Sequence, residues 1–243
     1  MSDFEHPNKK RKKQVQFLHK FIDRPVKFFI KHNISPNILS YCGFLCSLAA
    51  SFFIAIGVMY NLFWLAWIIP FLMFWAGAFD VFDGEVARKT GKLTKTGAFL
   101  DSNLDRLSDA IMILGLIYSG IINFIVGYIM MFLVIMISYI RARAENEGIN
   151  MKGIGFMERA ERVVFLMSAL TVETWIYHFS VISTGEPWVV YNPLIAKIPV
   201  TWFFLVFILG YTFLLIITII QRLIFTFKAL GKDCSQKSQL HAG

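Results

Sequence analysis

The sequence predicts an all-α integral membrane protein in which six transmembrane helices follow an interfacial amphipathic helix. Of its 243 residues, 56% are hydrophobic and 25 are phenylalanine, a composition typical of a membrane protein. Charged residues are absent from three long stretches, 38–79, 110–140 and 198–221. Each stretch is long enough to cross a bilayer at least once, at about 20 residues per helix.

The first 34 residues divide into two parts that precede the predicted membrane helices. Residues 1–13 are polar and end in a run of basic residues, so we expect a flexible basic arm. Residues 14–34 place apolar and charged side chains on opposite faces of a helix. We therefore expect an amphipathic helix lying in the membrane interface. A cleaved signal peptide is not expected, because the first long apolar stretch begins only at Ile38.

The transmembrane domain is expected over residues 35–228 and should contain six helices. Pro36 suits the first position of the first helix. The apolar stretch that begins at Ile38 is long enough to cross the membrane twice, with a break near residue 60. A less apolar segment, interrupted by charges at its start and by Glu173, supplies a further crossing. The expected helices lie near residues 38–59, 62–83, 97–120, 123–144, 158–180 and 198–224.

Positive charge is sorted between the two sides of the predicted helices. The N-terminal arm, the 84–97 loop and the 144–158 turn with its flanks are basic. The polar C-terminal tail, 229–243, and the end of the helix before it add Arg222, Lys228 and Lys232. The alternate connections carry almost nothing positive except Lys197. By the positive-inside rule, both termini and the 84–97 loop face the cytoplasm. The net charge of +8 then reflects topology and attraction to anionic lipid, and no nucleic-acid partner is needed.

Four aspartates lie at the cytoplasmic ends of the second and third predicted helices: Asp80, Asp83, Asp101 and Asp105. At helical spacing, the first two share one face of the second helix, and the last two share one face of the third. Very small residues accompany them on these faces, namely Gly84, Ala87 and Gly97. Carboxylates this close would repel one another unless they shared a cation, and ligation by oxygen alone suits Mg²⁺ or Mn²⁺.

The order and spacing of these residues resemble the signature of a known family. Asp-x-x-Asp-Gly-x-x-Ala-Arg begins at Asp80, and Gly-x-x-x-Asp-x-x-x-Asp follows after eight residues. The pattern is similar to that of the CDP-alcohol phosphotransferases, which are integral membrane enzymes of phospholipid synthesis. The resemblance implies transfer of a phosphatidyl-type group from a CDP-lipid, either CDP-diacylglycerol or CDP-archaeol, to an alcohol, with release of CMP. It also implies a homodimer in the cell membrane.

The resemblance assigns roles to the residues of the motif. It implies that two divalent ions, Mg²⁺ or Mn²⁺, are held by Asp80, Asp83, Asp101 and Asp105. It also makes Asp105 the general base that receives the proton of the acceptor hydroxyl. The nucleotide end of the CDP-lipid would be held by Asp80, Gly84, Ala87, Arg88 and Gly97, together with Asn37 from a Pro-Asn-x-x-Ser element that ends at Ser40.

Arginines near the same membrane face indicate which alcohol is the acceptor. Ser-Tyr-x-Arg-Ala-Arg-Ala-Glu and the later Glu-Arg-x-Glu-Arg resemble the phosphatidylinositol-phosphate and archaetidylinositol-phosphate synthase branch, whose acceptor is inositol 1-phosphate. That branch implies that the acceptor phosphate is held by Arg141, Arg159 and Arg222, with Arg143 and Arg162 as neighbours. Guanidinium groups match phosphate oxygens. A structural alternative is an i,i+4 ion pair between Glu158 and Arg162.

Other functions are compatible with parts of this pattern. The same reaction could use glycerol 3-phosphate or another alcohol, because a basic pocket would serve either acceptor. A cation transporter or channel is the rival of a different class, since acids inside a membrane often line an ion path. Against it, the acids gather at the ends of two helices, and the other helices carry no intramembrane charges that continue a path. A purely structural cluster would pair the acids with Arg88 and Arg106, although intramembrane acids are costly and usually functional.

Overall fold

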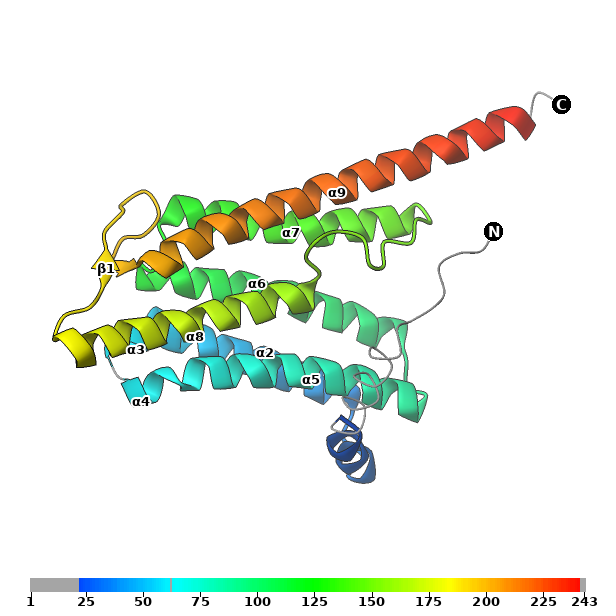
Figure 1. The fold of residues 1–243 in the computed structure, drawn as a ribbon. Coiled ribbons are helices and arrows are strands. Elements are labelled where there is room, and N and C mark those ends of the chain that lie inside the picture. Colours follow the sequence, from blue (N-terminus) through cyan, green and yellow to red (C-terminus); the bar gives the residue numbers. More distant parts are fainter. Residues whose placement is uncertain (1–21, 62, 241–243) are drawn as a thin grey trace, which may run out of the picture.

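The computed structural model describes residues 22–61 and 63–240. The predicted flexible arm, 1–13, and the first part of the predicted amphipathic helix, 14–21, lie outside the described residues. The rest is mainly helical, as predicted (Figure 1). Its helices are α2 (Pro36–Ala55), α3 (Val58–Asn61), α4 (Phe63–Ala66), α5 (Ile68–Thr90), α6 (Lys95–Ser119), α7 (Phe124–Asn146), α8 (Arg159–Thr184) and α9 (Trp202–Leu240).

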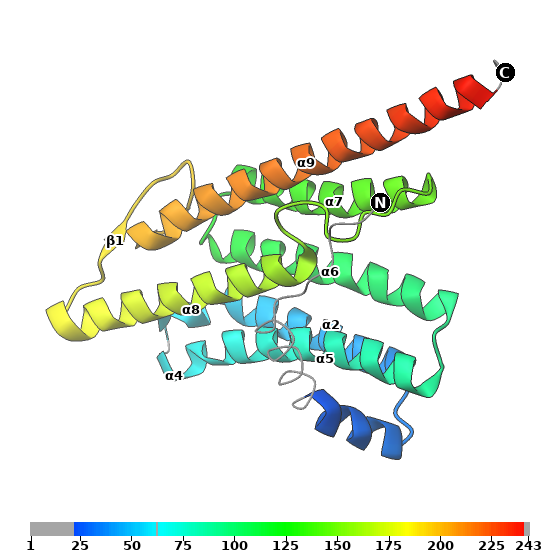
Figure 2. The same cartoon turned by 45° about the vertical axis from the view of Figure 1, so that its right-hand side comes forward.

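The long helices α2 and α5 to α9 run side by side and form one bundle (Figures 1 and 2). One end of the bundle carries the short connection between α5 and α6 and the turn between α7 and α8. The opposite end carries α3, α4 and a two-stranded antiparallel sheet, which pairs β1 (Val189–Val190) with β2 (Val200–Thr201). Because α5 ends and α6 begins at the first of these ends, their aspartates lie at one end of the bundle.

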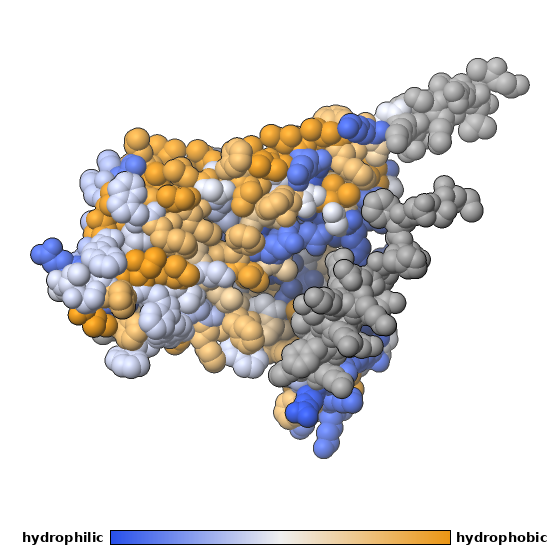
Figure 3. Space-filling view, viewed as in Figure 1, coloured by the Kyte–Doolittle hydropathy of each residue, from blue (hydrophilic) through white to orange (hydrophobic). Residues whose placement is uncertain are grey.

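In the described part of the chain, five helical segments are long and apolar enough to cross a membrane: Pro36–Ala55, Phe63–Thr90, Phe124–Asn146, Arg159–Thr184 and Trp202–Gly231. Apolar residues cover much of the bundle surface in Figure 3, and hydrophilic residues gather toward the end that bears the α5–α6 connection. Helix α6 is not among the five, because its N-terminal half carries several charged residues. A multi-pass helical architecture is therefore observed, while the sixth crossing stays a prediction.

Several observed helix ends differ from the predicted ones. Helix α9, for example, extends from Trp202 to Leu240, where the sequence predicted a helix near 198–224. The first helix ends at Ala55 and is followed by Gly57 at φ +73°, so the break precedes the residue near 60 that the sequence indicated. Helix α5 continues to Thr90, seven residues beyond the predicted end, and stops where Gly91 adopts the left-handed conformation that glycine tolerates (φ +67°). Hydropathy locates the apolar crossing, whereas the helix itself continues into polar sequence.

Helix α2 packs closely between α5 and α6 because small residues face its neighbours. A Cβ atom added at Gly43 would lie 3.2 Å from the carbonyl oxygen of Ala76 on α5. One added at Gly115 on α6 would lie 2.5 Å from Ser51 Oγ, which donates a hydrogen bond of 2.6 Å to the carbonyl oxygen of Ile111. These contacts fix the relative positions of the two helices that carry the aspartates.

The described part of the predicted amphipathic helix is helical over residues 22–31 and lies at an angle to the bundle at the aspartate end (Figure 2). Its Val26 is fully buried in a small apolar cluster with Leu39 of α2 and Phe82 and Val86 of α5. Phe28, in contrast, is 54% exposed. This helix therefore packs against the ends of α2 and α5 while leaving an aromatic side chain uncovered.

Candidate active site

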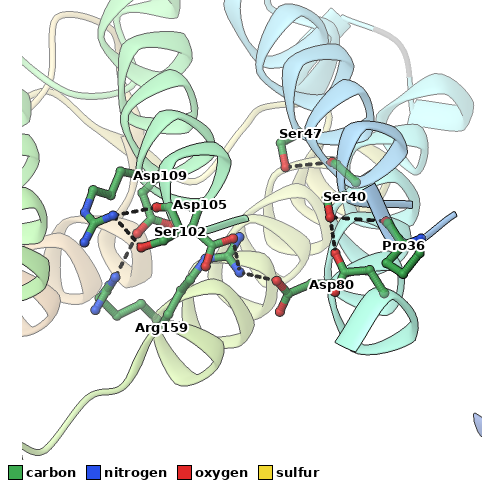
Figure 4. A network of polar contacts seen from close by, with 12 residues as sticks. Pro36, Ser40, Ser47, Asp80, Ser102, Asp105, Asp109 and Arg159 are labelled. Carbon is green, nitrogen blue, oxygen red and sulfur yellow. Dashed lines mark hydrogen bonds and ion pairs between the residues drawn. The ribbon is translucent and has the colours of Figure 1, made fainter. Parts of the chain in front are cut away.

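The four predicted aspartates line one cavity at the end of the bundle. Figure 4 shows two of them, Asp80 and Asp105, together with Arg159. One carboxylate oxygen from each of Asp80, Asp101 and Asp105 lies within 4.8 Å of the others. Asp83 is 5% exposed and accepts a hydrogen bond of 2.6 Å from Ser40 Oγ of α2. The helical spacing of the motif thus brings acids from α5 and α6 together, as the sequence suggested.

A short, capped connection sets the position of α6 against α5. Thr94 is the N-cap of α6, and its Oγ1 accepts a hydrogen bond of 3.0 Å from the backbone N–H of Gly97. A Cβ atom at Gly97 would lie 3.0 Å from that same Oγ1 and 3.4 Å from Asn37 Oδ1 of α2. Gly97 therefore lets the start of α6 approach Asn37.

Arg159, at the start of α8, reaches into the aspartate cavity from a third helix. Its Nη1 lies 2.8 Å from Asp80 Oδ1 and 2.8 Å from Asp105 Oδ1, so it bridges α5 and α6. The Arg159 side chain is 27% exposed, and within the described part of the chain its Nε is buried without a hydrogen-bond partner. Of the five predicted acceptor-binding arginines, Arg159 is the one that lines the cavity.

A second ion pair joins α6 to α8 next to the first. Arg162 Nη2 lies 2.8 Å from Asp109 Oδ2, and the two side chains are only 4% and 10% exposed. Asp109 was missed by the motif analysis, although it continues the four-residue spacing of Asp101 and Asp105 by one more turn. The predicted alternative pair of Glu158 with Arg162 is wrong, because Glu158 instead accepts a 2.9 Å hydrogen bond from the backbone N–H of Gly153.

In the described residues, the four aspartates do not pair with Arg88 and Arg106, which was the structural alternative. Arg88 Nη2 lies 2.8 Å from Glu85, and Arg106 Nη1 donates to the carbonyl oxygen and hydroxyl of Ser102 on its own helix. Four carboxylates thus line a cavity to which the described part of the chain contributes one cationic side chain, Arg159. This excess of closely spaced oxygen donors suits a hard divalent cation such as Mg²⁺ or Mn²⁺.

Of the six predicted nucleotide-binding residues, Asp80 lines the cavity and the other five do not. The guanidinium of Arg88 lies over Gly84, where an added Cβ would be 3.7 Å from Arg88 Nη2. Ala87 is 8% exposed, so its methyl group is packed inside the protein instead of facing an open surface. Asn37 and Gly97 meet on the other side, between α2 and α6. Gly84 and Gly97 thus lie against side chains of the protein itself, and a nucleotide site at these residues stays a prediction.

The remaining predicted acceptor-binding arginines have partners within the protein. Arg141 and Arg143 pair with glutamates one turn later on α7, Glu145 at 2.9 Å and Glu147 at 2.7 Å, and both arginines are well exposed. Arg222 is 2% exposed and donates to two carbonyl oxygens, those of Ile154 and Ile137. Arg222 lies near enough to Arg141 and Arg162 for their charges to interact. These arginines therefore gather at the cavity end of the bundle.

A buried glutamate on α8 lies far from the cavity and offers no continuation of an ion path. Glu173 is fully buried and accepts hydrogen bonds from the hydroxyl of Tyr60 at 2.9 Å and the backbone N–H of Thr201 at 3.0 Å, as well as from the Thr201 hydroxyl. It lies 14 residues beyond Arg159, or about 21 Å along the helix at 1.5 Å per residue. Its hydrogen bonds join α8 to the α3 and β2 end of the bundle.

Comparisons with known proteins identify similar sequences. The model of the family described as CDP-alcohol phosphatidyltransferase matches residues 33–227. An archaetidylinositol phosphate synthase of Pyrococcus horikoshii is 37% identical over 149 residues, covering 61% of this chain and 75% of that protein. Another, from Methanothermobacter thermautotrophicus, is 44% identical over 93 residues, covering 38% of this chain and 47% of that protein.

Solved structures share the fold. The phosphatidylinositol phosphate synthase of Mycobacterium tuberculosis with CDP-DAG bound superposes with a TM-score of 0.64 at 24% identity, covering 86% of this chain and 94% of that one. The same enzyme in complex with manganese and citrate gives a TM-score of 0.65 at 23% identity, covering 85% and 88%. The arrangement of the helices in this chain is therefore that of a known membrane enzyme fold.

Proposed function

Because the chain belongs to the CDP-alcohol phosphatidyltransferase family, we propose that it transfers a lipid phosphate group from a CDP-lipid to the hydroxyl of inositol 1-phosphate and releases CMP. The observation that carries this proposal is the convergence of the four motif aspartates on one cavity, with oxygens of three of them within 4.8 Å. Relatives named as archaetidylinositol phosphate synthases favour this acceptor. The lipid donor is CDP-diacylglycerol or CDP-archaeol.

We expect two divalent ions, Mg²⁺ or Mn²⁺, to be held by the carboxylates of Asp80, Asp83, Asp101 and Asp105. The convergence of oxygens from Asp80, Asp101 and Asp105 within 4.8 Å supports a metal site here. Such ions supply charge neutralisation for a diphosphate and for the departing CMP oxygen. The protein supplies the fixed geometry. Ser40 orients Asp83 through its 2.6 Å hydrogen bond, and the capped start of α6 fixes Asp101 and Asp105 against α5.

Asp105 acts as the general base in this proposal. It is on the α8 side of the cavity, where Arg159 contacts it, so a hydroxyl arriving from the arginine side meets this carboxylate. The proton of the acceptor hydroxyl passes to Asp105 while the hydroxyl oxygen bonds to the lipid-side phosphorus and the bond to CMP breaks. Asp109, one turn further along α6, is tied to Arg162 and is therefore not available for this task.

The substrates approach the aspartates from two sides. The nucleotide lies along the face of α5 and α6 that carries the small residues, within reach of Asn37 and Arg88. The acceptor phosphate lies on the α7, α8 and α9 side, where the basic residues Arg141, Arg143, Arg159, Arg162 and Arg222 gather. For Arg162 and Arg222 to bind it, they must exchange the partners that they hold in this structure.

The proposal includes an arrangement of the protein in the membrane. Helix α6 crosses as the sixth span, with its acids facing the cavity and its apolar C-terminal half in the bilayer. Both termini and the cavity face the cytoplasm, as the distribution of basic residues favours. Residues 14–34 lie in the membrane interface. The functional unit is a homodimer, by analogy with the family.

A matrix of substrates tests the proposal. The purified protein in lipid nanodiscs is given CDP-diacylglycerol or CDP-archaeol with inositol 1-phosphate, free inositol or glycerol 3-phosphate, and CMP release is measured with and without Mg²⁺. We expect metal-dependent release with inositol 1-phosphate. Equal use of free inositol would show that the arginines set the membrane topology and do not bind an acceptor phosphate. A strong preference for glycerol 3-phosphate would change only the identity of the acceptor. Absence of CMP release with every pair would reject the reaction.

A further inference from the structure

Arg159 contacts the same oxygens that a divalent ion would use. Its Nη1 lies 2.8 Å from Oδ1 of both Asp80 and Asp105, which are two of the three acids whose oxygens converge within 4.8 Å. A Mg²⁺ ion binds oxygen at about 2.0–2.1 Å. An ion on these two oxygens would therefore lie close to the guanidinium, and the two positive charges would compete for the same carboxylate oxygens.

Arg162 provides the contrast that shows Arg159 to be the exchangeable arginine. Arg162 has a carboxylate partner of its own, Asp109, which is not among the converging acids, and both side chains are buried. Arg159 contacts acids of the motif, and within the described residues its Nε is buried without a partner. It also occupies the first turn of α8, where the helix dipole disfavours a cation. The aspartates are thus the main interaction that holds Arg159 inside the cavity.

We propose that Arg159 is a tethered cation that exchanges with the divalent metal on Asp80 and Asp105, so that metal binding and acceptor-phosphate binding are coupled through this one side chain. The inference rests on the proposed function. Metal binding releases the guanidinium from the carboxylates, and its planar donor fork then becomes available to an anion at the edge of the cavity. An anion that engages Arg159 in turn frees the carboxylates for the metal.

The coupling must have the same size in both directions, because linkage between two ligands is reciprocal. Inositol 1-phosphate should raise the affinity for the metal by the same factor by which the metal raises the affinity for inositol 1-phosphate. Coupling between sites typically amounts to about 5- to 150-fold. Until the acceptor or metal arrives, Arg159 neutralises part of the charge on the acid cluster and keeps α5, α6 and α8 together.

Metal affinity measured without substrate is the first test. Mn²⁺ binding to the purified full chain in nanodiscs is followed by the electron paramagnetic resonance of free Mn²⁺. We expect Arg159→Ala to bind Mn²⁺ about tenfold tighter than the wild type or more, because the competing cation is gone. Arg106→Ala is the matched control, since it removes the same charge one residue from Asp105, yet among the described residues Arg106 bonds only to Ser102. We expect it to change the affinity by less than about threefold.

Two outcomes of this test would overturn the exchange. Unchanged or weaker Mn²⁺ binding by Arg159→Ala would show that the arginine does not compete with the metal. An equal gain in Mn²⁺ affinity for Arg106→Ala would show that the effect comes from removing any positive charge near the acids. These failures differ from failure of the proposed function: if the wild-type protein bound no Mn²⁺ at all, the metal site itself would be wrong and the exchange would fall with it.

Chemical labelling shows the movement directly. Phenylglyoxal modifies accessible arginines, and modification of each arginine is measured by peptide mass spectrometry. Saturating Mn²⁺ should raise the labelling of Arg159 several-fold and leave Arg162, in its buried pair with Asp109, unchanged. Equal labelling of Arg159 with and without Mn²⁺ would contradict the exchange. Inositol 1-phosphate should tighten Mn²⁺ binding in the wild type and lose that effect in Arg159→Ala, and an undiminished effect in the variant would assign the coupling to another residue.

Discussion

Removing Asp109 tests whether the buried pair between α6 and α8 maintains the packing of the bundle. The Asp109→Ala substitution leaves the guanidinium of Arg162 without its only carboxylate partner in the described structure, at a position where the side chain is 4% exposed. Breaking a buried ion pair by removing one partner typically costs about 3–5 kcal/mol, because the remaining charge is buried without compensation. At about 1.4 kcal/mol per factor of ten, the folded-to-unfolded ratio should fall roughly 10²- to 10⁴-fold.

The Asp109→Ala substitution also removes a repulsion on α6, but this stabilising contribution is too small to reverse the expected loss of stability. Asp109 and Asp105 are like charges at i,i+4 on α6, and removing one of such a pair relieves repulsion of only about 0.2–0.5 kcal/mol. The matched control is Glu147→Ala, which breaks the exposed pair with Arg143, whose side chains are 63% and 44% exposed. Exposed pairs contribute about 0–1 kcal/mol, so this control should lose little stability.

Equilibrium unfolding in mixed detergent micelles, followed by tryptophan fluorescence and circular dichroism, measures both variants. A third variant, Asp109→Ala combined with Arg162→Met, separates loss of packing from the buried charge. It should recover most of the lost stability, since apolar replacement of a buried pair is often neutral. The reasoning would be refuted if Asp109→Ala were no less stable than Glu147→Ala, or if the double variant were as unstable as the single one.

Three further outcomes are expected. Asp105→Asn should retain CDP-lipid binding and lose turnover by about 10²- to 10⁴-fold, as for loss of a general base, and a parallel loss of binding would mark it mainly as a metal ligand. Gly97→Ala should raise the KM for CDP-lipid by roughly tenfold, since its Cβ would lie only 3.0 Å from Thr94 Oγ1 and would shift the start of α6 beside Asn37. An unchanged KM would place the nucleotide elsewhere. Glu173→Gln should lower stability by about 1–3 kcal/mol, because one of the donors that bond to Glu173 loses its acceptor. The Mn²⁺ affinity should not change, and a changed affinity would show that the two ends of the bundle are coupled.

The convergence of the acids could be predicted because it follows from the spacing of residues along each helix. Asp101 and Asp105 follow Gly97 at intervals of four, and a helix brings such residues to one face whatever surrounds it. The short connection between α5 and α6 then places that face beside Asp80 and Asp83. Helix ends were less predictable, since α5 runs to Thr90 through polar residues that hydropathy does not register.

The partners of the arginines could not be predicted, because they come from other helices. In the sequence, Arg162 has one visible candidate partner, Glu158, four residues away. In the fold, Glu158 turns back to the N–H of Gly153, and Arg162 pairs with Asp109, which is 53 residues away in the chain. Local spacing records contacts within one helix only. Arg222 shows the same limit, since its donors are used by carbonyl oxygens of Ile137 and Ile154.

The arginines also differ in how firmly the fold holds them, and this difference bears on acceptor binding. Arg162 and Arg222 are 3% and 2% exposed and have fixed partners, so recruiting them to a phosphate would require α8 and α9 to give up existing contacts. Arg141 and Arg143 are held only by exposed pairs that contribute about 1 kcal/mol or less. Of these five arginines, only Arg159 combines contact with carboxylates of the motif and partial exposure. An arriving phosphate should therefore engage Arg159 and the α7 arginines first, and reach the buried pair only if the helices move.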